Sequence, residues 1–149
     1  MNFKEAYEYA LKNGASEYTR NIVCRDPYLA YMYAKDIDKC PRKDTREAAC
    51  KDAYYAYLYA LDVDKHPRED TRKAACKSPY SAYWYALYVD KRPRRDTRES
   101  ACKILHMAYK YATEIDQGSN EYSYRIISKT LYKKEYEKFL KNQMKEKII

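Results

Sequence analysis

The sequence contains few residues that interrupt regular structure, and it has no long apolar segment. Only two of its 149 residues are glycine. No run of about 18 apolar residues occurs, so we expect no transmembrane helix. The N-terminal segment MNFKEAYEYALKNGASEY lacks the apolar core of a signal peptide. We therefore expect a protein without a signal peptide that works in the cytoplasm.

Residue constellations that would carry out catalysis are also lacking. The two histidines, His66 and His106, are 40 residues apart, and no Ser/His/Asp or Cys/His set accompanies either of them. Carboxylates such as Asp36 and Asp38 are two positions apart, so they point to different sides of a helix. We expect no enzyme, and no catalytic, cofactor-binding or metal-binding residues.

The cysteines are spaced too widely for a disulfide framework or a zinc site. Four of the five recur at intervals of 26 residues, and equivalent points on stacked repeats lie roughly 8–10 Å apart. A disulfide needs Cα atoms within about 7 Å, and zinc needs four ligands around one ion. We therefore expect one small buried side chain in each repeat. The series is Cys24, Cys50, Cys76 and Cys102, with Cys40 outside it.

The main feature of the sequence is an internal repeat. A 26-residue unit occurs three times in succession, as Asp26–Lys51, Asp52–Lys77 and Ser78–Lys103. Self-similarity at a fixed short period predicts an array of stacked structural units. Charged residues make up 35% of the chain and tyrosines number 20. With so little glycine, this composition favours a helical protein over a disordered one.

Each unit predicts two short helices, which we name helix A and helix B. Helix A begins at an N-cap followed by proline, as in Asp26-Pro27, and runs for about 12 residues to the neighbourhood of Lys39. Helix B is predicted to start at the Asp-Thr-Arg triplet, with Asp44 as its N-cap and Glu47 completing a capping box. The equivalent N-caps are Asp70 and Asp96, and Glu99 completes the box in the third unit.

These elements predict an all-α fold, a right-handed α-solenoid of about four to five 26-residue helical hairpins in one domain, residues 1–149. Residues 1–25 form a degenerate first repeat, and residues 104–119 form a partial one. Residues 120–149 are predicted to form a longer C-terminal capping helix. Atypical terminal units of this kind keep an open-ended array soluble.

The unit also resembles short two-helix repeats of the form D-P-x-x-A-Y-x-Y-A in tailed-phage and metagenomic proteins of unassigned function. The residues that carry the resemblance are Asp26-Pro27 with Ala30–Ala34, and Ser78-Pro79 with Ala82–Ala86. The similarity covers roughly residues 1–117. It departs in the linker, where Lys/Arg-Pro-Arg stands in place of a Trp-Pro-Glu sequence. The resemblance implies a phage or mobile-element origin, and it transfers no active site.

Residues that are identical in every unit are most simply explained by stacking, because every unit faces the same neighbours. Two tyrosine columns are predicted to be buried with their hydroxyls on carboxylates, to form an exposed ladder for nucleic-acid bases, or to divide between these roles. An arginine column is predicted to pair with the series Asp38, Asp64 and Asp90, or alternatively to contact phosphates. The columns are Tyr31, Tyr57, Tyr83 and Tyr109; Tyr33, Tyr59, Tyr85 and Tyr111; and Arg46, Arg72 and Arg98.

Positions that vary between units are free to specialise for a partner. The net charge of +8 is concentrated in the C-terminal half, in an arginine cluster and a lysine-rich terminal segment. A basic patch favours a polyanion or an acidic protein surface, and the alternative is an ordinary solvated face. The candidate partner-binding residues are Tyr55, Arg68, Trp84, Tyr88, Arg92, Arg94 and Arg95.

Two functional hypotheses follow. The first is a non-enzymatic interaction protein that binds a host or phage protein, with inhibition of a bacterial defence complex as one use that the resemblance implies. The alternative is a basic, tyrosine-rich module that binds RNA or DNA with an affinity that falls steeply with salt. Self-association through a tyrosine-rich edge is a third possibility, and the oligomeric state stays open.

Overall fold

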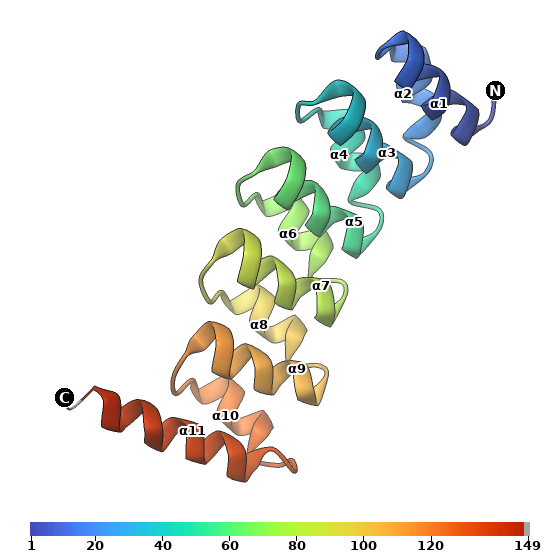
Figure 1. Cartoon of the computed structure of the whole chain (residues 1–149). Helices are drawn as coiled ribbons and strands as arrows, with labels where there is room; N and C mark the ends of the chain where they lie inside the picture. Colours follow the sequence, from blue (N-terminus) through green and yellow to red (C-terminus); the bar gives the residue numbers. More distant parts are fainter. Residues whose placement is uncertain (148–149) are drawn as a thin grey trace. The chain divides into compact units, whose positions relative to one another are not determined.

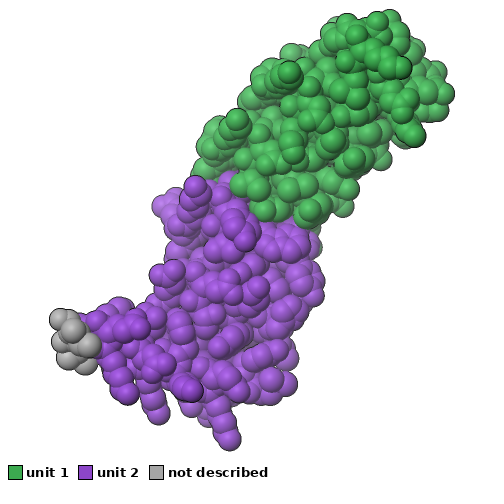
Figure 2. Space-filling view, in the orientation of Figure 1, with its two compact units in different colours: residues 1–77 green, residues 78–149 purple. Residues whose placement is uncertain are grey.

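The computed structural model describes residues 1–147, and every regular element in that range is a helix (Figure 1). The contacts divide the chain into two compact units, residues 1–77 and residues 78–149 (Figure 2). Within each unit, consecutive helices pack as hairpins, and each hairpin packs against the next one in the chain. The predicted all-α array of helical hairpins is therefore confirmed. No helix within residues 1–147 has the length and apolar composition to span a bilayer.

The helices of the two units follow one another in a regular order, in which most helix-A segments end in a turn of π-helix (η). Unit 1 contains α1 (Phe3–Asn13), α2 (Glu17–Val23), α3 (Pro27–Tyr33), η1 (Ala34–Asp38), α4 (Lys43–Ala49), α5 (Ala53–Leu58), η2 (Tyr59–Asp64) and α6 (Glu69–Ala75). Unit 2 contains α7 (Pro79–Trp84), η3 (Tyr85–Asp90), α8 (Arg95–Ala101), α9 (Leu105–Lys110), η4 (Tyr111–Asp116), α10 (Glu121–Ile127) and α11 (Lys133–Glu146).

Helix A of the first full repeat begins where the sequence predicts. The Asp26 side chain accepts the backbone N–H of Leu29, and Pro27 occupies the first helical position. The helix ends at Asp38, after a π-helical turn that the sequence does not predict, and Lys39 then adopts a left-handed conformation. That conformation costs a residue other than glycine about 1–2 kcal/mol. The left-handed residues are Lys39 (φ 54°), Lys65 (φ 59°), Lys91 (φ 52°) and Gln117 (φ 50°).

The prediction for the start of helix B is wrong. The N-cap of α4 is Arg42, whose side chain makes no capping hydrogen bond, and Asp44 lies inside the first turn. The hydroxyl of Tyr59, from the next helix A, instead accepts the N–H of Arg42 at 3.0 Å. A tertiary contact thus replaces the local cap. Arg68 and Arg94 are likewise the N-caps of α6 and α8, in place of Asp70 and Asp96, so Glu47 and Glu99 complete no capping box.

The prediction of a single long C-terminal helix is also wrong. The chain turns between α10 and α11, where the Thr130 hydroxyl donates to the Ile127 carbonyl at 2.8 Å and accepts the N–H of Tyr132 at 3.2 Å. The helix α10 packs on α9 and completes a hairpin where a partial repeat is predicted. The following helix, α11, has 14 residues and places Tyr136 in the core. It therefore occupies the place of a further helix A.

Candidate functional site

The second tyrosine of each A-Y-x-Y-A motif belongs to the core. Tyr33, Tyr59, Tyr85 and Tyr111 have no exposed surface. The Tyr33 hydroxyl accepts the N–H of Ser16 at 3.0 Å and lies 2.8 Å from the Thr19 hydroxyl in the preceding hairpin. The hydroxyl of Tyr111 makes the same pair of contacts in unit 2, with Arg94 and Thr97. The rings of Tyr33 and Tyr111 thus fasten their helix A to the start of the preceding helix B.

The first tyrosine of the motif is also buried in the full repeats, and the hydroxyls of Tyr31 and Tyr83 each bind a carboxylate. Tyr31, Tyr57 and Tyr83 are between 2% and 7% exposed. Tyr31 donates to Asp62 and Tyr83 donates to Glu114, in each case two residues before the aspartate that pairs with the arginine column. The interpretation of these tyrosines as an exposed ladder for nucleic-acid bases is therefore wrong for the full repeats. The alternative, that their rings are buried, is confirmed.

The same contact in the first hairpin shows its electrostatic effect. The Tyr7 hydroxyl donates to Asp36 at 2.9 Å. Burial of the phenol, with the hydrogen bond to Asp36 and its charge added, raises the pKa of Tyr7 to about 12. The hydroxyl therefore stays protonated at neutral pH and remains a hydrogen-bond donor. These tyrosines hold the repeats together and are not available as acids or bases.

The arginine column forms ion pairs between successive hairpins within each unit. The Arg46 guanidinium contacts Asp64 through two nitrogens, with Nη2 at 2.6 Å from Oδ1 and Nε at 3.0 Å. Arg98 binds Asp116 in the same way in unit 2. Both arginine side chains are at most 15% exposed. The predicted inter-repeat ion pair is therefore confirmed for these two arginines, and the alternative role as phosphate ligands is wrong for them.

A third set of aromatic residues, which the sequence analysis missed, lies on the surface. Tyr28, Tyr54 and Tyr80 occupy the first turn of helix A and are between 41% and 46% exposed. In unit 1 the ring of Tyr55 lies 5.5 Å from Tyr28 and 5.6 Å from Tyr54. The spacing of 26 residues was a visible signal, but position alone did not separate these tyrosines from the buried columns.

The predicted aromatic candidates are exposed to different degrees. Tyr55 is half-buried and packs on the core cluster that contains Tyr31. Trp84 is half-buried too, and its ring centroid lies 6.3 Å from that of Tyr80. Tyr88 lies in η3 and is 50% exposed. Tyr55 belongs to unit 1, whereas Trp84 and Tyr88 belong to unit 2 and lie four residues apart in the same helix A.

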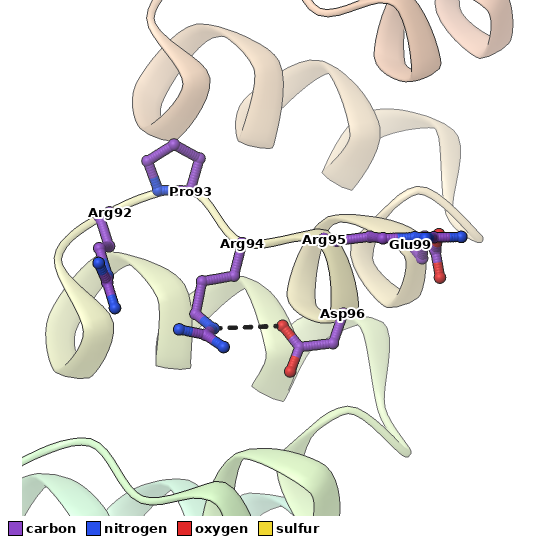
Figure 3. Close-up of a pocket in the computed structure, with 6 residues that line it drawn as sticks. All are labelled: Arg92, Pro93, Arg94, Arg95, Asp96 and Glu99. Carbon is purple, nitrogen blue, oxygen red and sulfur yellow. Dashed lines mark hydrogen bonds and ion pairs between the residues drawn. The ribbon is translucent and has the colours of Figure 1, made fainter.

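The structure brings the three candidate arginines of unit 2 together (Figure 3). Arg92, Arg94 and Arg95 line a shallow hollow of about 410 Å³ at the start of α8, together with Asp96 and Glu99. Arg94 Nε lies 3.6 Å from Asp96, and Arg95 Nε lies 2.7 Å from Glu99. Two of the three cations are thus already paired. The fourth candidate, Arg68, occupies the equivalent place in unit 1 and pairs with Asp70 at 3.0 Å.

The cysteines and histidines form no reactive site in the part of the chain that the structure describes. All five cysteines are free thiols. Burial raises the pKa of Cys24, Cys50 and Cys102 to about 11 in each case. Within residues 1–147 no three cysteine, histidine or acidic side chains converge as metal ligands would. His66 is exposed, and the ring of His106 contacts Tyr80.

No protein-family model, no curated protein and no solved structure was found to match this chain. Function therefore has to be argued from the surface itself. The surface offers two kinds of feature, the exposed aromatic rings in the first turns of helix A and the cations at the starts of helix B.

Proposed function

We propose that the protein is a non-enzymatic interaction protein whose partner is another protein. The tyrosines and arginines that recur in every repeat make hydrogen bonds and ion pairs between hairpins, so they are not available to a partner. What remains for a partner is the set of exposed and variable side chains. An array of short hairpins gains rigidity from repetition and presents an extended surface for recognition.

The observation that carries this proposal is the exposed aromatic cluster of unit 1. Tyr28 and Tyr54 are exposed, and both of their rings contact the ring of Tyr55, which is half-buried against the core. Aromatic side chains dominate the binding energy of protein interfaces, since they bury a large area and lose little conformational entropy. A surface cluster of three rings is therefore suited to anchor a protein partner.

The resemblance to phage repeats suggests where such a partner is found. A protein encoded by a phage or another mobile element would act in the host cytoplasm, on a host or phage protein. Inhibition of a bacterial defence complex is one such action. A rigid binding surface can block a complex by occupying the contact site of one of its components.

The alternative function is RNA or DNA binding through the basic side chains of unit 2. The observation that favours it is the arginine hollow formed by Arg92, Arg94 and Arg95. The arginine guanidinium forms bidentate hydrogen bonds with phosphate. Against it, Asp96 and Glu99 line the same hollow and would repel phosphate groups.

A pull-down of the tagged protein from bacterial lysate, with and without nuclease, separates the two functions. We expect a defined protein that is retained after nuclease treatment and in about 0.5 M salt, because aromatic contacts are screened little by ions. Tyr54→Ala with Tyr55→Ala should release it. Tyr18→Ala, a change of a 65% exposed tyrosine elsewhere, is the matched control and should retain it. Recovery of nucleic acid that is lost with salt would support the alternative.

A further inference from the structure

Five linkers in the chain perform the same structural task, which is to join a helix A to its helix B. Each contains a residue with positive φ and ends at the N-cap of helix B. The first and the last linker carry no cation, whereas the three internal ones carry several. The linkers are Gly14–Ser16, Lys39–Arg42, Lys65–Arg68, Lys91–Arg94 and Gln117–Asn120.

At the left-handed position, the internal linkers use a residue that is poorly suited to that backbone. The first linker has Gly14 instead, with φ 91° and ψ 171°, a positive-φ conformation different from that of the other four and one that glycine adopts without steric cost. The internal linkers have Lys39, Lys65 and Lys91. Gln117 adopts the same left-handed conformation in the fifth linker. The turn therefore does not require the lysine side chain.

The N-cap position shows the same substitution of a cation for a structural residue. Ser16 and Asn120 cap their helices with a side-chain hydrogen bond. Arg42, Arg68 and Arg94 occupy that place in the internal linkers and make no such bond. Serine and asparagine are the favoured N-caps, and arginine is not. At the positive-φ position and at the N-cap, the three internal linkers thus have a lysine or an arginine where a more stabilising residue would fit.

In unit 1 the linker lysines surround a carboxylate that is already engaged. Lys35, Lys39 and Lys65 line a hollow of about 250 Å³ together with Asp62. Asp62 accepts the Tyr31 hydroxyl and lies 3.2 Å from Lys35 Nζ. Within residues 1–147, Lys39 and Lys65 take part in no ion pair, and both are exposed. Two cations therefore face the hollow without a carboxylate of their own.

Unit 2 repeats this arrangement. Lys91 and Arg92 line a hollow of about 350 Å³ that also contains Glu114. Glu114 accepts the Tyr83 hydroxyl and lies 3.8 Å from Lys110. Neither Lys91 nor Arg92 forms an ion pair with any residue that the structure describes. Each unit therefore has an occupied acid beside two unpaired cations, although both cations of unit 2 come from one linker, because Gln117 stands at the position of Lys65.

We propose that the internal linkers of each unit bind acidic side chains of the protein partner, whose carboxylates lie between Lys39 and Lys65 in unit 1 and beside Lys91 and Arg92 in unit 2. This inference rests on the proposed function and adds the chemistry of the partner. Carboxylates pair with lysine as point charges and do not need the dense, unopposed positive charge that a phosphate backbone requires.

A protein partner fits the linkers better than a nucleic acid for two reasons. The N-cap arginines are interleaved with acids, since Arg42, Arg68 and Arg94 each lie within 3.6 Å of an aspartate two residues later. The exposed tyrosines, which could stack on bases, lie in the first turn of helix A, at the opposite end of each hairpin from the linker (Figure 1). The cations and the rings of one hairpin therefore lie apart and do not alternate along one groove, as they do in a single-strand binding site.

The test measures binding of two fluorescein-labelled probes to the full chain by anisotropy, a peptide of ten glutamates and an oligouridylate of ten nucleotides. We expect the peptide to bind at low salt and the oligonucleotide to bind no more tightly. The variant K39Q/K65Q/K91Q installs the residue found at position 117. It should lower the peptide affinity at least about tenfold without loss of helix content.

The matched control removes the same charge from the other end of each hairpin. Lys51, Lys77 and Lys103 are exposed, recur once per repeat and lie at the turn from helix B to the next helix A. The variant K51Q/K77Q/K103Q should keep the affinity of the unchanged chain for the peptide. An equal loss in both variants would overturn the proposal, because it would show that only net charge matters.

A second variant tests whether the lysines are kept at the expense of the fold. Replacing Lys39, Lys65 and Lys91 by glycine relieves the positive φ, so we expect a melting temperature that is unchanged or raised by about 2–4 °C, together with loss of peptide binding. Peptide binding that persists in this variant would overturn the proposal. So would an oligouridylate that binds more tightly than the peptide and is released by these substitutions.

Failure of this inference is distinguishable from failure of the proposed function. A partner captured from lysate that depends on Tyr54 and Tyr55 but is retained by K39Q/K65Q/K91Q would leave the proposed function standing and refute the acidic contact. A chain that binds the glutamate peptide through the linkers but captures no tyrosine-dependent protein would support the contact and count against the aromatic anchor.

Discussion

Tyr9 and Tyr33 occupy the same place in the A-Y-x-Y-A motif, but only Tyr33 is buried. Tyr9 is 50% exposed, and Tyr33 has no exposed surface. The difference is the preceding hairpin: Ser16 and Thr19 receive the Tyr33 hydroxyl, and no described helix precedes α1 to receive that of Tyr9. Burial of the motif is therefore a property of the neighbour and not of the motif itself.

The side of the first hairpin that faces the second hairpin makes the full set of inter-repeat contacts. Its Arg20 binds Asp38 through two nitrogens, at 2.6 and 3.0 Å, and its Tyr7 donates to Asp36. Towards the second hairpin it therefore makes the contacts that an internal hairpin makes. The incomplete face is confined to the outer side of α1, as expected for a stack in which each unit contacts only its neighbours.

The largest expected effect comes from truncating these two tyrosines. Tyr33→Ala should lower the free energy of unfolding by about 3–5 kcal/mol, because it leaves a ring-sized cavity and removes two buried hydrogen bonds. Tyr9→Ala should change it by less than about 0.5 kcal/mol, since the side chain is largely solvated. Urea unfolding followed by circular dichroism measures both. Similar losses in the two variants would contradict the comparison.

The inter-repeat ion pair gives the next largest difference. Asp64→Asn leaves the Arg46 guanidinium without its partner at a site where the Asp64 side chain is fully buried, and should cost about 3 kcal/mol. Asp70→Asn removes a carboxylate that is 48% exposed and pairs with Arg68, and should cost less than about 1 kcal/mol. The same urea experiment compares them. Equal midpoints would show that the buried pair adds nothing to stacking.

The sequence predicted the repeat, the helical hairpins and the Arg46–Asp64 pair because all of these recur at a fixed spacing. It failed where the deciding contact comes from another repeat. The N-cap of α4 is Arg42 and not Asp44, because the Tyr59 hydroxyl takes the role that a side chain would fill locally. Local capping rules do not include an acceptor from another repeat.

The candidate surface could be predicted only in part, for a related reason. The linker arginines were found from charge, and the structure gathers three of them in one hollow. The exposed tyrosines at Tyr28 and Tyr54 were missed, because helical period alone does not tell which of three tyrosines in one helix A faces solvent. The left-handed lysines were missed because a φ value leaves no mark in the sequence when the residue is not glycine.

A smaller effect isolates the hydroxyl from the ring. Tyr59→Phe keeps the packing but removes the contacts with Arg42 and Thr45, leaving a buried backbone N–H unsatisfied, and should cost about 1–3 kcal/mol. Tyr9→Phe is the matched change at the open face and should cost nothing measurable. A Tyr59→Phe variant as stable as the unchanged chain would show that water replaces the hydroxyl as the cap.

The last comparison concerns thiol reactivity and needs no substitution. Burial raises the pKa of Cys24, in the first hairpin, and of Cys50, in the next, to about 11. At pH 8 a thiol with that pKa is ionised on the order of one part in a thousand, and the thiolate is the reactive species. Cys40 is exposed in its linker. Iodoacetamide followed by peptide mass spectrometry should therefore modify Cys40 first, with Cys24 and Cys50 slow and alike. Faster modification of Cys24 than of Cys50 would show that the open face of α1 also loosens the side that packs on the second hairpin.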